Sequence, residues 1–186
     1  MNPSIILCVD DDTTVLSALR TLLGMRLGPG HLIEIAESGE EALELHAELQ
    51  AQGREISVVI SDYIMPGMRG DELLVQLHQR SPQAYTMLLT GQSDLQGVKR
   101  ATNEAKLYQF IEKPFNNEHL VDATRRACAL YRAAREREQA GAALRSVHEE
   151  LAAQLRATET ELERRRAELE RATAPLDGRA SVAGQA

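Results

Sequence analysis

The stretch SIILCVDDD at residues 4–12 joins six mostly apolar residues directly to three aspartates. A continuous apolar run of this length is typical of a strand that is buried on both faces of a sheet. Four more such runs follow, and segments with apolar residues at helical spacing separate them. The expected strands are 4–9, 31–36, 56–61, 84–90 and 107–112, and the expected helices are 13–27, 39–51, 71–80 and 93–104, with Ser38 and Ser93 as candidate caps.

Five strand–helix units predict an α/β fold, namely a doubly wound, five-stranded parallel sheet with helices on both faces. The expected strand order is 2-1-3-4-5. In such a sheet a ligand lies beyond the carboxyl ends of the strands. The residues that follow the strands are therefore the first candidates for chemistry.

Polar residues stand at the expected strand ends. Asp10 and Asp11 follow the first strand, Asp62 follows the third, Thr90 ends the fourth and Lys113 follows the fifth. Because the first and third strands are neighbours in this order, we expect the three aspartates to lie close together. Like charges at such a distance raise the pKa of at least one carboxyl unless a cation is bound, and carboxylate oxygens favour Mg²⁺. Lys113 can neutralise the charge that remains.

Four segments match a known family in order and spacing. They are ILCVDDD at 6–12, SDYIMPGMRGDELL at 61–74, MLLTGQSD at 87–94 and FIEKPF at 110–115. On these segments the chain resembles the receiver domain of two-component response regulators. The resemblance implies that the protein accepts a phosphoryl group from a sensor histidine kinase or a histidine phosphotransfer protein in a reaction that depends on Mg²⁺. Such a protein catalyses only its own phosphorylation and dephosphorylation, so we expect no other enzymatic activity.

The resemblance also implies roles for single residues. Asp62 is expected to be the phosphoacceptor. The expected Mg²⁺ ligands are Asp10, Asp11, Asp62 and the backbone carbonyl of Ile64. Ile64 and Gln92 correspond to the positions that flank the attacking water in receivers. Since Ile64 cannot orient a water and Gln92 is a poor base, we expect a phosphoryl lifetime of minutes or longer.

Three further residues correspond to the phosphoryl-contacting and switch positions of the family. Thr90 and Lys113 are expected to contact the phosphoryl group. Thr90 and Phe110 are expected to act as the switch, with Phe110 changing its rotamer on activation. The Lys113–Pro114 peptide bond is expected to be cis.

The pattern changes after about residue 116, where the last expected helix continues with a heptad repeat. Eleven of sixteen seam positions are apolar in the repeat that begins at Leu120. A single helix has nothing in its own chain to pack this stripe against. We therefore expect a receiver domain at 1–127, a homodimeric coiled coil at 128–172 that continues its last helix, and a disordered tail at 173–186. A solvated single helix held by Glu/Arg pairs is the alternative.

The formal net charge of −7 lies in the first two thirds of the chain, since residues 1–127 hold 11 basic and 18 acidic side chains, and residues 128–186 hold ten of each. The sequence shows neither a basic face nor a helix-turn-helix pattern, so we expect no nucleic-acid partner. No run approaches the roughly 20 apolar residues of a membrane span, so we expect no membrane insertion and a cytoplasmic location.

Two other interpretations remain open. In a phosphatase of the haloacid-dehalogenase type, DDDTT at 10–14 would supply Asp10 as the nucleophile and Asp12 as the general acid. Asp62 would then have no role, and no acidic pair follows Lys113 to hold a metal. Alternatively, the chain is the N-terminal part of a longer regulator whose effector domain is missing.

The histidines and cysteines are assigned no chemistry. His148 precedes a glutamate, as in histidine kinases, but Ala152 replaces the Thr or Asn of such sites, so we expect it to be a polar seam position. His31, His46, His78 and His119 are expected to be ordinary surface or strand-end residues. Cys8 and Cys128 are expected to be reduced and structural.

Overall fold

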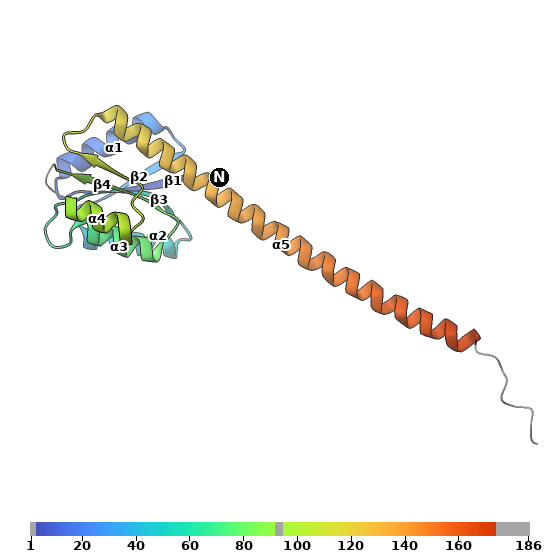
Figure 1. Ribbon diagram of the computed structural model, residues 1–186. Helices are drawn as coiled ribbons and strands as arrows, with labels where there is room; N and C mark the ends of the chain where they lie inside the picture. Colours follow the sequence, from blue (N-terminus) through green and yellow to red (C-terminus); the bar gives the residue numbers. More distant parts are fainter. Residues whose placement is uncertain (1–2, 92–94, 174–186) are drawn as a thin grey trace, which may run out of the picture. The chain divides into compact units, whose positions relative to one another are not determined.

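The computed structural model describes residues 3–91 and 95–173 and contains the expected five-stranded parallel sheet (Figure 1). Its strands are β1 (Ser4–Val9), β2 (His31–Ala36), β3 (Ile56–Asp62), β4 (Tyr85–Thr90) and β5 (Gln109–Glu112). The hydrogen-bonded order is β2-β1-β3-β4-β5, and all pairs are parallel. The predicted fold class and strand order are therefore confirmed.

The helices follow the strands as predicted. They are α1 (Thr13–Leu27), α2 (Gly39–Ala51), α3 (Gly70–Arg80), α4 (Leu95–Glu104) and α5 (Asn117–Thr173). The strand β5 begins two residues later than predicted, because the Leu107 N–H donates to the carbonyl of Ala101 and so belongs to the turn that closes α4. Among the helices in the described ranges, none has the length and apolar character needed to cross a bilayer.

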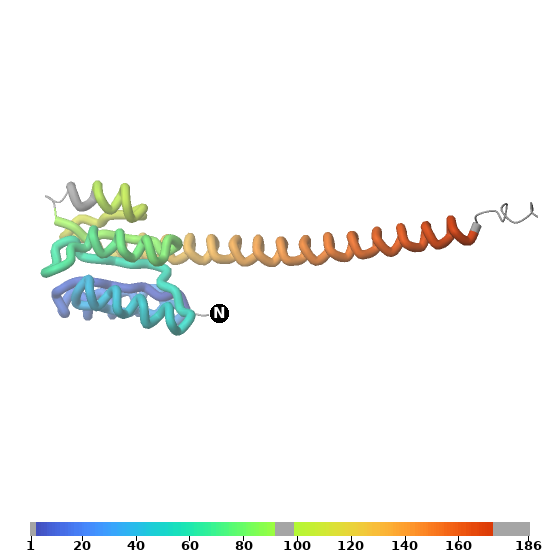
Figure 2. The backbone as a smooth tube through the Cα atoms, turned by 90° about the horizontal axis from the view of Figure 1, so that it is seen from below, coloured from blue at the N-terminus to red at the C-terminus, as the bar shows by residue number. Residues whose placement is uncertain are grey.

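Two hydrophobic cores cover the two faces of the sheet. Along β1, Ile5, Leu7 and Val9 belong to one core and Ile6 and Cys8 to the other, as the alternation of side chains along a strand requires. The first core is completed by α2, α3 and α4, which lie along the same face (Figure 2), and the second by α1 and α5. Both faces of the central strands are therefore buried, which explains their continuous apolar sequence.

A side-chain cap marks the start of α2 as predicted. The Ser38 hydroxyl accepts a hydrogen bond from the Glu41 N–H (3.1 Å), and the Glu41 carboxylate accepts one from the Glu37 N–H (2.6 Å). These bonds satisfy N–H groups that the helix itself leaves without a partner. Ser93, the other predicted cap, lies outside the described residues.

The helix α5 contributes to two compact units, of which the first ends at Arg135 and the second begins at Glu136. In the first unit Leu120, Ala123 and Ala127 are completely buried in the core that α5 shares with the sheet and α1. The prediction that this stripe has no packing partner in its own chain is wrong for these three positions, because they cover one face of the sheet.

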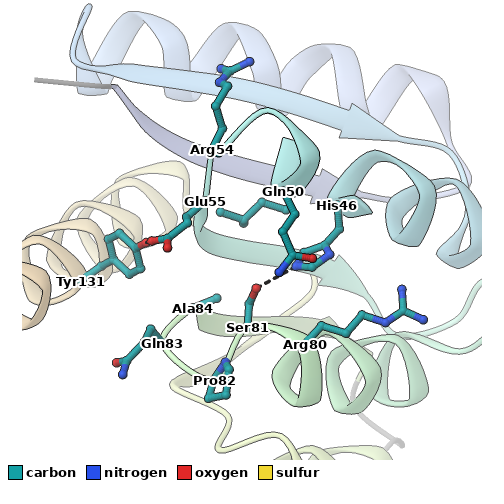
Figure 3. A pocket seen from close by; sticks show the side chains of 12 residues that line it. His46, Gln50, Arg54, Glu55, Arg80, Ser81, Pro82, Gln83, Ala84 and Tyr131 are labelled. Atoms are coloured by element: carbon teal, nitrogen blue, oxygen red, sulfur yellow. Dashed lines mark hydrogen bonds between the residues drawn. The ribbon is translucent and has the colours of Figure 1, made fainter. Parts of the chain in front are cut away.

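The histidine His46 corrects another prediction, because it is buried rather than at the surface, with 3% of its area exposed. Its Nε2 lies 2.7 Å from Ser81 Oγ, beside a pocket of about 240 Å³ at the amino ends of β3 and β4 (Figure 3). Tyr131 of α5 also lines this pocket, and its hydroxyl donates to the Glu55 carboxylate (2.7 Å). The pocket lies at the edge of the sheet opposite the predicted site.

Candidate functional site

Three carboxyl groups meet at the carboxyl ends of β1 and β3. These strands pair side by side, with Val9 opposite Ser61. Asp10 and Asp11, which follow β1, therefore come close to Asp62, which is the last residue of β3 and not, as predicted, the residue after it. One carboxylate oxygen from each of Asp10, Asp11 and Asp62 lies within 4.8 Å of the other two. Asp10 and Asp62 are buried, whereas Asp11 is exposed. The predicted convergence of the three aspartates is confirmed.

Lys113 supplies a positive charge to this cluster. Its Nζ lies 2.6 Å from Asp62 Oδ1 and 3.2 Å from Asp10 Oδ2. The Lys113 N–H donates to the carbonyl of Thr90 (2.8 Å), which joins the ends of β4 and β5. The Lys113–Pro114 bond is cis, as predicted. The two buried aspartates therefore share one ammonium group.

Burial raises the pKa of Asp62 above its ordinary value, because it disfavours the charged carboxylate. The hydrogen bond and the charge of Lys113 act to lower this pKa, and the charge of Asp10 acts to raise it. The raised pKa of Asp62 agrees with the prediction, but its largest cause is burial and not the repulsion between like charges. For Lys113, burial alone would lower the pKa, yet the hydrogen bond and charge of Asp62, together with Asp10, raise it.

The remaining predicted site residues lie in or just after β4, β3 and β5. Thr90 is the last residue of β4, is buried, and its hydroxyl donates to the carbonyl of Gly91 (3.2 Å). Ile64 lies two residues beyond β3 with 64% of its area exposed, and Phe110 lies in β5 with 53% exposed. Neither of these large apolar side chains is buried in the core. Gln92 lies outside the described residues.

Gly70, the first residue of α3, is a part of the site that the sequence reasoning missed. A Cβ at this position would collide with the carbonyl oxygen of Asp62 and would lie 2.9 Å from Ser61 Oγ. The Gly70 N–H donates to the carbonyl of Tyr63 (3.0 Å), and the Ser61 hydroxyl donates to that of Asp62 (2.9 Å). The start of α3 is thus packed directly onto the backbone of Asp62. A glycine at the start of a predicted helix, eight residues after the key aspartate, was the available signal.

The donor set of the cluster fits a hard divalent cation. Asp10, Asp11 and Asp62 offer carboxylate oxygens, which are the ligands that Mg²⁺ prefers. The exposed position of Asp11 leaves one side of the cluster open to solvent, and Mg²⁺ usually keeps several waters. An acidic site of the kind that binds Mg²⁺ is therefore present.

Comparison with known proteins decides the family. The family model described as "Response regulator receiver domain" matches residues 6–125, which is more than half of the chain. The chain belongs to this family. The resemblance that the four sequence segments indicated is thereby confirmed, and residues 126–186 lie outside the match.

Curated relatives match the receiver domain and part of α5. The C4-dicarboxylate transport transcriptional regulatory protein DctD of Pseudomonas aeruginosa is 34% identical over 145 residues, which cover 77% of this chain and 29% of the relative. The hydrogenase transcriptional regulatory protein HoxA of Cupriavidus necator is 32% identical over 122 residues, which cover 66% of this chain and 23% of the relative. The chain thus spans about a quarter of the length of these relatives.

Solved structures agree with this assignment. The signal receiver domain of an HD domain-containing protein from Pseudomonas fluorescens Pf-5 matches with a TM-score of 0.64 and 32% sequence identity. The match covers 74% of this chain and 95% of that domain. The receiver fold is therefore supported by both sequence and structure.

The environment of Asp12 and the family assignment both contradict the phosphatase alternative. The Asp12 carboxylate accepts a hydrogen bond from the Thr14 N–H (2.7 Å) and so caps α1. That backbone hydrogen bond lowers the pKa of Asp12, which is the wrong direction for a general acid. The Asp12 N–H in turn donates to Asp10 Oδ1 (2.9 Å). In this receiver Asp12 therefore orients the start of α1 and the neighbouring Asp10.

Proposed function

We propose that this receiver domain accepts a phosphoryl group on Asp62 from a sensor histidine kinase or a histidine phosphotransfer protein. The Lys113 ammonium at 2.6 Å from Asp62, beside two further acids, supports this proposal best. Phosphoryl transfer requires a positioned nucleophile and compensation of the charge on the phosphoryl oxygens, with little covalent work for the rest of the protein. The cluster contains residues for both tasks.

The Asp62 carboxylate is the nucleophile in this proposal. One of its oxygens attacks the phosphorus of a phosphohistidine, the N–P bond breaks, and the imidazole leaves with the electrons of that bond. Lys113 moves its hydrogen bond from Asp62 Oδ1 to a phosphoryl oxygen, and the Thr90 hydroxyl contacts another. The rotamers of Thr90 and Phe110 then change and alter the surface that partners contact.

The proposed metal ligands are Asp10, Asp11, Asp62 and the backbone carbonyl of Ile64. Mg²⁺ supplies positive charge next to the phosphoryl oxygens when it is bound. Asp10 is held in place by the Asp12 N–H and by Lys113. Removal of the metal with EDTA should therefore prevent phosphorylation and leave the fold intact.

The direct test is labelling with acetyl phosphate, followed by mass spectrometry of the intact chain. One phosphoryl group should be added, and Asp62→Asn should abolish the addition. The matched control is Asp12→Asn, because an asparagine at this position can still cap α1 and keeps the backbone N–H that donates to Asp10. Labelling that survives Asp62→Asn would contradict the assignment of the phosphoacceptor.

The proposal includes a phosphoryl lifetime of minutes or longer. The exposed Ile64 side chain supports it, since it offers no group that could orient an attacking water. The decay of the labelled protein after donor removal measures this lifetime, and Ile64→Asn should accelerate it. Decay within seconds in the parent chain, or no acceleration in the variant, would refute the argument.

We extend the proposal to a homodimer formed by the part of α5 that lies in the second unit. The large apolar side chains exposed there support it, since burial of one leucine stabilises an assembly by about 1.5–3 kcal/mol. Light scattering should report a dimer for the parent chain and a monomer for the double variant Leu155→Glu and Leu162→Glu. A parent chain that is monomeric at tens of micromolar would contradict this part.

The signalling output of phosphorylation would be a change in the contacts that this dimer makes with other proteins. The formal net charge of −7 supports the further expectation of no nucleic-acid partner. A cytoplasmic location remains part of this proposal. The same phosphotransfer reaction would apply if the chain were the N-terminal part of a longer regulator.

A further inference from the structure

The second unit exposes a row of five leucines, which we call the leucine stripe. Its members are Leu144, Leu151, Leu155, Leu162 and Leu169, and each has between 55% and 71% of its area exposed. All five fall on the a and d positions of the heptad repeat, so they lie along one side of α5. The earlier seam positions Leu120, Ala123 and Ala127 are buried in the receiver core, and Leu130 is 44% exposed, so most of the exposed apolar seam lies in the second unit.

The spacing of the leucine stripe distinguishes two ways of pairing with a second copy of the chain. In a parallel, in-register pair every leucine faces its own copy, which gives five leucine layers. In one antiparallel alignment Leu151 faces Leu162 and Leu144 faces Leu169, which gives four leucine layers, but Leu155 faces the polar Thr158. The antiparallel alignment shifted by one heptad also gives four leucine layers, but it places Leu169 opposite Arg137. Apolar packing therefore favours the parallel pair.

The charges beside the stripe favour the same orientation. Glu161 occupies a g position and Arg166 the following e position, and these two positions approach each other across a parallel pair. Twofold symmetry makes this attraction occur twice. In the antiparallel alignment that pairs Leu151 with Leu162, Arg166 would instead approach Arg145 of the second copy, which places like charges together.

One seam residue opposes the parallel pair. Arg165 occupies a d position and would face its own copy. Its Nε, however, donates to Glu161 Oε1 on the same helix (3.0 Å), which draws the guanidinium toward the rim of the seam and compensates its charge. The repulsion is therefore reduced by a contact that the isolated helix already makes.

Resting on the coiled-coil homodimer of the proposed function, we propose that two copies pair through residues 144–172 in parallel and in register. Glu161 of each copy then faces Arg166 of the other. The interface begins at the leucine stripe and not at Leu120.

The charge test uses Arg166→Glu and measures the dimer dissociation constant by sedimentation. In the parallel pair this change replaces two attractions by two repulsions, and the constant should rise about fivefold or more. The further change Glu161→Arg should recover part of the lost affinity, because it restores the attraction between the copies but also removes the partner of Arg165. Arg166 has an ion pair with Glu170 on its own helix (3.1 Å), and Arg164 has one with Glu168 (3.2 Å). The matched control is therefore Arg164→Glu, since Arg164 lies at a c position outside the seam. Tighter pairing of Arg166→Glu would overturn the parallel orientation.

The orientation test uses single cysteines that spare the leucine stripe, in Gly141→Cys and in Ala172→Cys. A side chain at position 141 has open space around it, with only Arg145 Nη1 nearby at 3.6 Å. Under mild oxidation each variant should cross-link to itself, whereas the parent chain should not, because Cys8 and Cys128 are buried.

Each outcome of the cysteine test has one meaning. Cross-links that form only when the two variants are mixed would overturn the parallel orientation and leave the dimer intact. A chain that light scattering finds monomeric would overturn the dimer and the orientation together, while acetyl phosphate labelling of Asp62 would still stand on its own test.

Discussion

Replacing Gly70 with alanine is expected to destabilise the receiver and to disturb Asp62 at the same time. The added Cβ would overlap the Asp62 carbonyl oxygen and would lie 2.9 Å from both the Asp62 carbonyl carbon and Ser61 Oγ. Since carbon atoms prefer a separation of about 3.5 Å or more, α3 or β3 must move by at least about 0.6 Å. Overpacking of this kind costs about 1–3 kcal/mol, which exceeds the gain of up to about 1 kcal/mol in helix propensity.

Urea denaturation and acetyl phosphate labelling together test this prediction. The free energy of unfolding should fall by about 1–2 kcal/mol, and the labelling rate should fall because the backbone of the phosphoacceptor has shifted. The matched control is Gly24→Ala in α1. Apart from its chain neighbours and the backbone of its own helix, no heavy atom lies within 4 Å of the added Cβ, so stability should stay equal or rise. Unchanged stability and an unchanged labelling rate in Gly70→Ala would refute the reasoning.

Three further predictions concern the rest of the receiver. Glu55→Gln removes the ion pair with Arg135 (2.9 Å), and because both groups are partly exposed, urea denaturation should show a loss of only about 0.5–1 kcal/mol. Burial, followed by the charge of Arg80, lowers the pKa of His46, so the unfolded chain binds more protons near this pKa than the folded chain does. The free energy of unfolding measured by urea denaturation should therefore fall as the pH drops below about 6.5, and it should fall less in His46→Gln. Burial raises the pKa of Cys8 to about 12 and that of Cys128 to about 11, so iodoacetamide should modify both only after unfolding, and rapid reaction in the native chain would contradict their burial.

The receiver fold and the acidic cluster follow from short-range patterns in the sequence. Continuous apolar runs predict buried strands. In a doubly wound sheet the direction of winding reverses, and in the order 2-1-3-4-5 this reversal places β1 beside β3. Once these strands are neighbours, the aspartates at their carboxyl ends must meet, which is why Asp10, Asp11 and Asp62 could be grouped from the sequence. Recognition of the family then required only that the four segments occur in the right order.

Contacts between distant segments were beyond the reach of the same patterns. His46 has the spacing of the buried face of α2, four residues after Ala42 and three before Leu49, but its polar ring suggested a surface position. The structure shows it buried, with its ring beside Ser81. The close approach of Gly70 to the Asp62 carbonyl depends on the path of the loop between β3 and α3, which no local periodicity encodes. Burial as the first cause of the raised Asp62 pKa likewise depends on how deeply the assembled sheet and loops cover that side chain.

The helix α5 shows most clearly which features the sequence determined and which only the tertiary structure decided. The sequence by itself determined that the heptad repeat begins at Leu120, because periodicity depends only on the order of apolar residues. Only the tertiary structure decided that Leu120, Ala123 and Ala127 cover the sheet, whereas Leu144 and the later leucines remain exposed. The physical reason is that an apolar stripe specifies burial without specifying the partner, and the partner is set by which surfaces the rest of the chain brings within reach.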